Sequence, residues 1–236
     1  MTILLTTMRL KNIFTYILLL VAISFAASDT MAQNRSATID GKESSDSISL
    51  YRGIAVSIDA AGAVQRAVSS YGQYEAALRI NLKDRYFPVV EIGIGDADNT
   101  DDATSLRFKT SAPYFKAGCD FNILKNKHDD YRAYVGVRYA FTSFKYDVEG
   151  QSVNDPIWGG EAIYAAYDVK GSSHWAELLA GVDAKIVGPF RLGWSFRYRS
   201  RISQKHGDIG EAWYVPGYGK KGSSRLGATF NLILEI

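Results

Sequence analysis

Apolar side chains recur at every second position through most of the chain beyond residue 50. For example, Val135, Val137 and Tyr139 alternate with Gly136 and Arg138. Successive side chains of a β-strand point to opposite faces, so this period predicts strands with one apolar and one polar face. Eight stretches show the pattern: 53–59, 73–80, 88–95, 115–122, 132–142, 177–186, 190–199 and 225–235.

The connectors between these stretches alternate between short and long. The short ones are 83–85, 125–129 and 187–189, and the others are 96–106, 147–172, 202–222 and the intermediate 61–70. Short turns at one end and long loops at the other are typical of outer-membrane barrels. With a few flanking residues, each stretch reaches the roughly 9 to 11 residues that a tilted strand needs to cross a bilayer.

We therefore predict an all-β fold, an eight-stranded antiparallel up-and-down transmembrane β-barrel. The strands must close into a ring, because an open edge in lipid would leave backbone groups unpaired. An even number of strands puts both termini on the same side, which we expect to be the periplasmic side. A soluble lipocalin-like carrier remains the alternative fold, since it would show the same alternation with its apolar faces inside.

Aromatic residues collect near the ends of the predicted strands, as in the two aromatic girdles of a membrane barrel. We assign to these girdles Tyr51, Tyr71, Tyr86, Tyr114, Tyr131, Phe144, Trp175, Phe190 and Tyr198.

The polar faces carry charges of both signs, and buried charge is tolerated only when it is paired. An eight-stranded barrel is just wide enough to be filled by its own side chains. We therefore predict a cross-linked ionic interior and no open pore, formed by Glu75, Arg79, Glu91, Lys116, Asp120, Arg132, Arg138, Glu177, Asp183, Arg191, Arg197 and Arg199. If Lys185 lies opposite Arg191 in the hairpin at Gly188, then Glu177 lies opposite Arg199.

The first residues read as a secretory signal peptide. Arg9 and Lys11 precede an apolar run, 13–27, which is shorter than the roughly 20 residues of a spanning helix. Small residues around Ala32 offer a cleavage site. We therefore expect a signal peptide over 1–32, a flexible periplasmic tail over 33–49 and the barrel domain over 50–236.

Composition narrows the function classes. Lys and Arg number 27 against 25 Asp and Glu, and this balance argues against nucleic-acid binding. A single cysteine excludes an internal disulfide and a cysteine-built metal cage. We expect Cys119 to face lipid, where a thiol behaves as a small apolar group.

The candidate catalytic and metal-binding residues are sparse. Ser173, His174 and Glu177 are the nearest approach to the catalytic set of a lipid-modifying enzyme, but neighbouring strand residues such as Ser173 and His174 diverge. Asp96, Asp98, Asp101 and Asp102 crowd one loop without the spacing of an EF-hand, so we interpret the loop as solvated. We expect no enzyme activity, no metal and no cofactor.

Aromatic residues in the long loops have two interpretations. Trp158, Tyr164, Trp213 and Tyr214, with Tyr167 and Tyr218 nearby, either bind a partner or pack together to order the loops.

The last strand carries a short motif. Arg225, Gly227, Phe230 and Leu232 follow a polar, glycine, hydrophobic, hydrophobic spacing. This spacing resembles the β-signal of outer-membrane barrels, which implies recognition by the barrel-assembly machinery. Leu232 stands where an aromatic residue is commoner.

Four further stretches resemble an uncharacterised family of Gram-negative outer-membrane barrels, domain of unknown function 6048. They are 71–79, 108–115, 122–127 and 139–144. The resemblance implies a fold and a location but names no activity and no functional residues.

The sequence thus predicts a small monomeric outer-membrane barrel with a filled charged interior, in contact with outer-membrane lipid. Its role would be structural, or binding of an unknown ligand through extracellular loops. A lipid-modifying enzyme, a narrow channel and the soluble carrier are the alternatives.

Overall fold

The fold is that of a computed structural model, which describes residues 49–126, 129–154, 161–205, 207 and 209–236. The expected signal peptide and nearly all of the expected tail lie outside these residues. The elements in chain order are β1 (Tyr51–Asp59), α2 (Ala60–Val68), β2 (Tyr71–Leu82), β3 (Tyr86–Thr100), β4 (Arg107–Asn122), β5 (Tyr131–Asn154), β6 (Glu161–Val187), β7 (Phe190–Lys205), β8 (Tyr214–Val215), β9 (Gly219–Lys220) and β10 (Ser224–Glu235).

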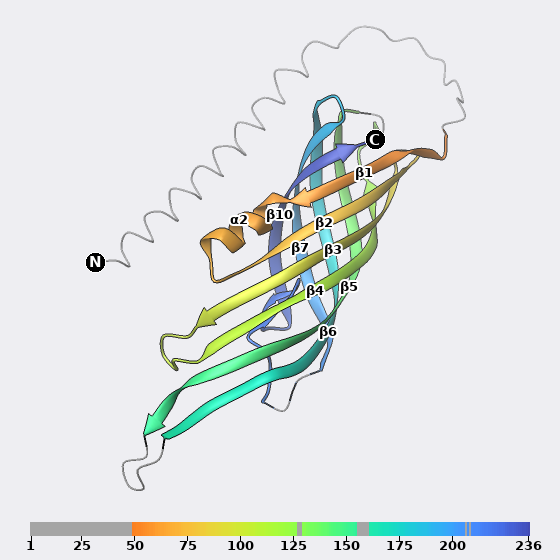
Figure 1. The fold of residues 1–236 in the computed structure, drawn as a ribbon. Helices are drawn as coiled ribbons and strands as arrows, with labels where there is room; N and C mark the ends of the chain where they lie inside the picture. Colours follow the sequence, from red (N-terminus) through yellow and green to blue (C-terminus); the bar gives the residue numbers. More distant parts are fainter. Residues whose placement is uncertain (1–48, 127–128, 155–160, 206, 208) are drawn as a thin grey trace, which may run out of the picture. The chain divides into compact units, whose positions relative to one another are not determined.

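Eight of the strands form a closed antiparallel barrel in the order β1-β10-β7-β6-β5-β4-β3-β2 (Figure 1). Each predicted stretch lies within one of these strands, so the predicted fold class is confirmed. The ring closes where Ala55–Asp59 of β1 pair with Asn231–Glu235 of β10. The remaining two strands, β8 and β9, form a small separate hairpin.

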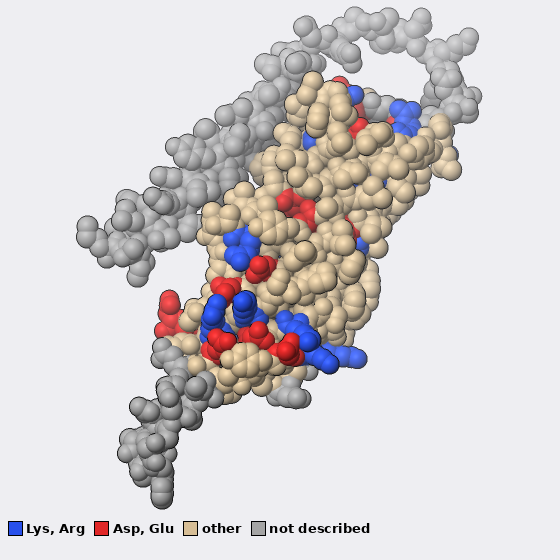
Figure 2. Space-filling model, viewed as in Figure 1, with Lys and Arg blue, Asp and Glu red and all other residues tan. Residues whose placement is uncertain are grey.

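The apolar residues of the strands face outward and the charged residues face inward. Ile92, Val135 and Leu232 are 51%, 41% and 42% exposed, whereas Arg197 and Glu177 are 4% and 0% exposed. Such an inverted surface requires an apolar environment around the barrel, which is the arrangement of a transmembrane barrel and not of a soluble carrier. Most of the wall in Figure 2 is accordingly free of charged side chains.

The register of β6 and β7 follows the prediction made from their hairpin. Lys185 pairs with Arg191, and Glu177 pairs with Arg199. Gly188 has a φ of 54°, a left-handed conformation that glycine adopts at no steric cost. A shift of the pairing between Lys185 and Val187, beside this turn, brings the charged faces of both strands to the same side of the sheet.

The helix α2 is an addition that the periodicity did not predict. It follows directly after β1 and packs against β2 and β10, which flank β1 in the ring. Asp59 begins the helix, because its side chain accepts a hydrogen bond from Ala61 N at 3.0 Å. The same Asp59 Oδ1 accepts from Phe230 N at 3.1 Å, so it also satisfies a backbone N–H group of β10 beyond the end of β1.

Two glycines let α2 approach the barrel closely. A Cβ on Gly62 would lie 2.7 Å from the carbonyl oxygen of Gln73, and a Cβ on Gly72 would lie 2.5 Å from Arg66 Cα. Helix and strand therefore touch backbone to backbone. Among the described residues, no helix is long and apolar enough to cross a membrane.

The long connector expected over 147–172 was predicted wrongly. Most of 147–172 is strand, because β5 continues to Asn154 and β6 begins at Glu161. The strands that approach this end of the barrel are longer than the apolar stretches, and Figure 1 shows β5 and β6 extending furthest. Polar residues can continue a ladder of backbone hydrogen bonds, so the end of the apolar alternation does not mark the end of the strand.

Candidate functional site: the filled interior and the loop end

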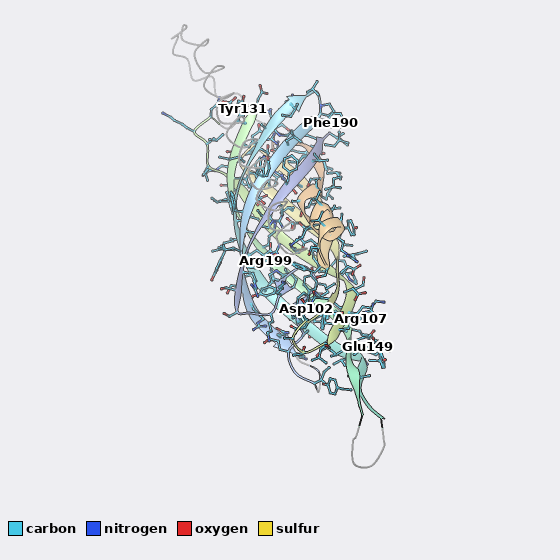
Figure 3. The ribbon with its side chains drawn as sticks, turned by 90° about the vertical axis from the view of Figure 1, so that its left-hand side faces the viewer. Asp102, Arg107, Tyr131, Glu149, Phe190 and Arg199 are labelled. Carbon is cyan, nitrogen blue, oxygen red and sulfur yellow. The ribbon has the colours of Figure 1, made fainter. Side chains whose placement is uncertain are left out.

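We call the end of the barrel that carries 83–85, 123–126 and 188–189 the turn end, and the opposite end the loop end. Figure 3 shows Tyr131 and Phe190 at the turn end and Asp102, Arg107 and Glu149 at the loop end. The centre of the barrel and its loop end differ in chemistry and are considered in turn.

A single lysine and an arginine hold three glutamates in the centre of the barrel. Lys116 Nζ on β4 lies 2.8 Å from Glu75, 3.1 Å from Glu177 and 3.7 Å from Glu91. Arg197 Nη1 on β7 lies 3.0, 2.8 and 3.5 Å from Glu75, Glu91 and Glu177 respectively. We call these five residues the central cluster. It joins strands from opposite sides of the ring.

Further ion pairs extend the central cluster toward the turn end. Arg138 binds Glu91 at 3.1 Å and Asp120 at 2.7 Å. Asp183 lies between Arg79 and Arg191, at 3.0 and 2.7 Å. The charges of the interior are thus neutralised locally, as buried ionic groups require.

All the residues predicted for the ionic interior are buried there. Arg199 binds Glu177 at 3.3 Å, and Arg132 binds Glu235 at 2.8 Å. Glu235 belongs to the same network but was not predicted, because it falls at the very end of the last strand. The signal was present, since Glu235 continues the alternation in which Asn231 and Ile233 face inward.

An aromatic layer lies between the central cluster and the loop end. Tyr114 donates a hydrogen bond to Glu75 Oε2 at 2.9 Å, and Trp175 Nε1 donates to Glu177 Oε1 at 2.8 Å. Tyr114, Phe144 and Trp175 are therefore inside, with exposures of 0%, 4% and 0%, and their assignment to the outer girdles was wrong. The aromatic rings therefore separate the central cluster from the loop end.

The connector from β7 to β10 folds into this layer. Tyr214, Val215 and Tyr218, from the β8–β9 hairpin, are buried. Tyr214 donates a hydrogen bond to the carbonyl of Gly72 at 3.0 Å, and Arg199 donates to the carbonyl of Tyr218 at 2.9 Å. The hairpin is a plug held by the barrel wall. A turn signal, Pro216-Gly217, could have located the hairpin, but nothing in the sequence directs it inward.

The cavity between the charged side chains at the centre of the barrel is small. A cavity lined by Asp59, Glu75, Glu91 and Arg197, among others, has a volume of about 20 Å³. That is room for about one water molecule. Within the described residues, this cavity is too small for a hydrated solute.

The loop aromatics do not form one exposed surface. Tyr164 is 52% exposed, whereas Tyr214 is 2% exposed, so the binding interpretation fails for Tyr214 and the packing interpretation applies. Trp213 is half-buried, and Lys220 Nζ lies 5.0 Å from the centre of its ring. Trp158 lies outside the described residues.

The candidate catalytic residues are separated by the barrel wall. Ser173 is buried inside, while His174 points outward and its Nδ1 lies 2.8 Å from the hydroxyl oxygen of Tyr139. Within the described ranges, no group of three or more His, Cys, Asp or Glu side chains is placed to hold a metal. Cys119 is half-buried on the outward face between Gly118 and Asp120.

The acidic loop is organised by its own hydrogen bonds. Asp101 Oδ1 accepts from Thr104 N at 2.9 Å, from Thr104 Oγ1 at 3.1 Å and from Ala103 N at 3.0 Å. These donors, the Thr104 backbone first, hold the pKa of Asp101 below its usual value. Asp98 is paired with Arg107 at 2.8 Å.

The outward faces of β3 and β5 change from apolar to polar toward the loop end. On β3 the apolar residues run from Tyr86 to Ile94, and Asp96 follows; on β5 they run from Tyr131 to Phe141, and Ser143 follows. These bands have the length of about 9 to 11 residues expected for a membrane crossing. The loop-end boundary of the apolar band therefore lies near Asp96 and Ser143.

These features define the class of protein: a small transmembrane β-barrel with an ionic, plugged interior. The chain belongs to the family described as domain of unknown function DUF6048, whose model matches residues 9–235.

Among solved structures, the chain is similar to Neisserial surface protein A (NspA), with 14% identity, a TM-score of 0.43, and coverage of 79% of this chain and 99% of that one. It is similar to Ail, the attachment invasion locus protein of Yersinia pestis, with 10% identity, a TM-score of 0.36, and coverage of 78% and 93%. A major outer membrane protein from Thermus thermophilus has 15% identity, a TM-score of 0.39, and coverage of 78% and 100%. No curated protein matches the sequence. The fold assignment rests on the hydrogen-bonded ring of strands itself.

Proposed function

We propose that the protein is a monomeric barrel of a Gram-negative outer membrane that has a structural or binding role at its loop end and does not conduct solutes. The observation that carries the proposal is the filled interior. Lys116, 1% exposed, is surrounded by carboxylates, and the plug lies above it. An eight-stranded barrel with such contents leaves only its outer surfaces for function.

The proposed orientation places the loop end outside the cell and both ends of the barrel domain in the periplasm. Bacterial outer-membrane barrels have short periplasmic turns and longer extracellular loops. The β-signal-like residues Arg225, Gly227, Phe230 and Leu232 all lie on β10, the strand that closes the ring with β1. This position fits recognition of β10 by the barrel-assembly machinery.

A binding or structural role is favoured over lipid modification by the placement of the candidate residues. A serine nucleophile must lie within hydrogen-bond reach of its base. Ser173 and His174 face opposite sides of the wall, and the outward partner of His174 is Tyr139, not a carboxylate.

Conductance tests the proposal. The purified protein, inserted into planar bilayers with a porin as a positive control, is expected to show no discrete current steps, because about one water molecule fits the interior cavity. Reproducible steps that depend on the protein would contradict the proposal and support the narrow channel.

A further inference from the structure

The outward face of the barrel carries charges immediately beyond the loop-end boundary of the apolar band, and two sides of the barrel arrange them differently. On the side of β3, β4 and β5, cations and anions alternate. Asp98 lies opposite Lys109, and Lys109 lies opposite Asp147 across the next pair of strands. Arg107 binds Asp98 at 2.8 Å. Figure 2 shows positive and negative side chains gathered together toward this end.

On the side of β5, β6 and β7, three lysines share the outward face. Lys145 of β5 lies directly opposite Lys170 of β6, and Lys205 of β7 lies opposite Ser172, two residues further along β6. All three lysines are exposed. We call Lys145, Lys170 and Lys205 the lysine patch.

The register brings these lysines close enough to share one anion. Directly opposite residues have Cβ atoms about 5 Å apart, and diagonal neighbours lie about 7 Å apart. Like charges directly opposite each other destabilise a sheet, so Lys145 and Lys170 favour anions beside them.

The carboxylates near the lysine patch neutralise it only in part. Asp168 binds Lys145 at 2.8 Å, and Asp147 Oδ1 accepts from Asp168 N at 2.8 Å. Asp147 also lies opposite Lys109. Lys145 and, after it, Lys170 lower the pKa of Asp168, so a single carboxylate faces two of the three lysines.

Hydroxyl groups lie between the lysine patch and the apolar band. Ser143 and Ser172 are opposite each other on the outward face, and Phe141 and His174 follow on the side of the membrane. A ligand at the lysine patch would therefore contact the ammonium groups first and the hydroxyl groups next, in the direction of the membrane. Its apolar part would lie against the apolar band of the barrel.

We infer that the lysine patch binds the phosphate of a phosphorylated lipid in the outer leaflet. The inference rests on the proposed function, because it takes the loop end to be external. The position decides between a lipid headgroup and a free phosphate, because the lysine patch lies within a few residues of the acyl-chain boundary on three adjacent strands. Basic residues near a membrane surface attract anionic headgroups in this way.

The test compares lipid retention by two variants of the whole protein, purified in detergent doped with bisphosphorylated lipid A. The triple variant Lys145→Gln, Lys170→Gln and Lys205→Gln is expected to retain lipid A about tenfold less well than the wild type. The matched control is Lys109→Gln, an exposed outward lysine opposite Asp147, which is expected to retain lipid A as the wild type does. Unboiled and boiled gel migration confirms that each variant is folded.

Two further probes separate the sources of binding. Dephosphorylated lipid A is expected to bind wild type and triple variant equally weakly, and inorganic phosphate alone is expected not to bind. Retention of bisphosphorylated lipid A by the triple variant at the wild-type level overturns the inference. So does binding of dephosphorylated lipid A by the wild type as tight as that of the bisphosphorylated lipid, or saturable binding of inorganic phosphate without lipid. Conductance of the barrel would instead refute the proposed function and leave these binding results unchanged.

Discussion

Replacement of Lys116 with methionine is expected to lower the free energy of unfolding by about 3 to 5 kcal/mol, the usual effect of removing one partner from a buried ion pair. Lys116 faces Glu75, Glu91 and Glu177. Without it, Glu91 and Glu177 keep Arg138 and Arg199, but Glu75 depends on Arg197. Unfolding by guanidinium in detergent micelles, followed by tryptophan fluorescence, measures the change.

The control is Lys109→Met, which removes an exposed lysine from the outward face and is expected to change stability by less than about 1 kcal/mol. Addition of Glu177→Gln to Lys116→Met removes one of the carboxylates that Lys116 had paired and is expected to recover part of the loss. If Lys116→Met is as stable as the wild type, the ion pairs of the central cluster do not stabilise the fold.

Replacement of Val137 with arginine is expected to destabilise the barrel by about 2 to 4 kcal/mol, the cost of a basic residue on the lipid face near the middle of the membrane. Val137 is 49% exposed and lies well within the apolar outward band of β5. In a soluble barrel the same change at an exposed position would cost almost nothing.

Ser143→Arg provides the matched control, because Ser143 lies on the same strand and the same face, just beyond the apolar band. Its expected cost is about 0 to 1 kcal/mol. Unfolding in lipid vesicles gives both values. Equal effects at the two positions would show that no hydrophobic layer surrounds β5.

The barrel fold could be predicted from the sequence because three patterns agree: a period of two, an even number of strands, and connectors that alternate between short and long. The register of β6 and β7 depends on an irregularity beside the turn, because the pairing shifts by one residue between Lys185 and Val187. The ionic interior followed from the same alternation. Its pairings did not, because contacts such as that of Arg197 with Glu75 cross the barrel and depend on its closure.

The alternation was more reliable than the position along a strand. Tyr114 lies two residues from Lys116, and Trp175 lies two residues from Glu177, so each shares a face with an interior charge. Their position near strand ends pointed to the outer girdle instead, and that assignment was wrong. Tyr86, Tyr131 and Phe190 are exposed, as a girdle at the turn end requires.

No pattern in the sequence predicted the helix α2 or the inward course of the β8–β9 hairpin. Nothing in 60–68 shows that the helix fits between β2 and β10, since that fit depends on the glycines at 62 and 72 meeting backbone from the other element. The inward course of the β8–β9 hairpin depends on hydrogen bonds to Gly72 and from Arg199, which lie far apart in the sequence. Both features arise from tertiary contacts.

The direction in which the strand faces point can be measured by spin labels at two outward positions. In a Cys119→Ser background, nitroxides are placed at Val135→Cys and Leu232→Cys in reconstituted vesicles. The account predicts that both labels collide more often with molecular oxygen, which concentrates in lipid, than with a water-soluble nickel chelate. Collision with the chelate in preference to oxygen at both positions would mean that these side chains meet water, and would contradict the account.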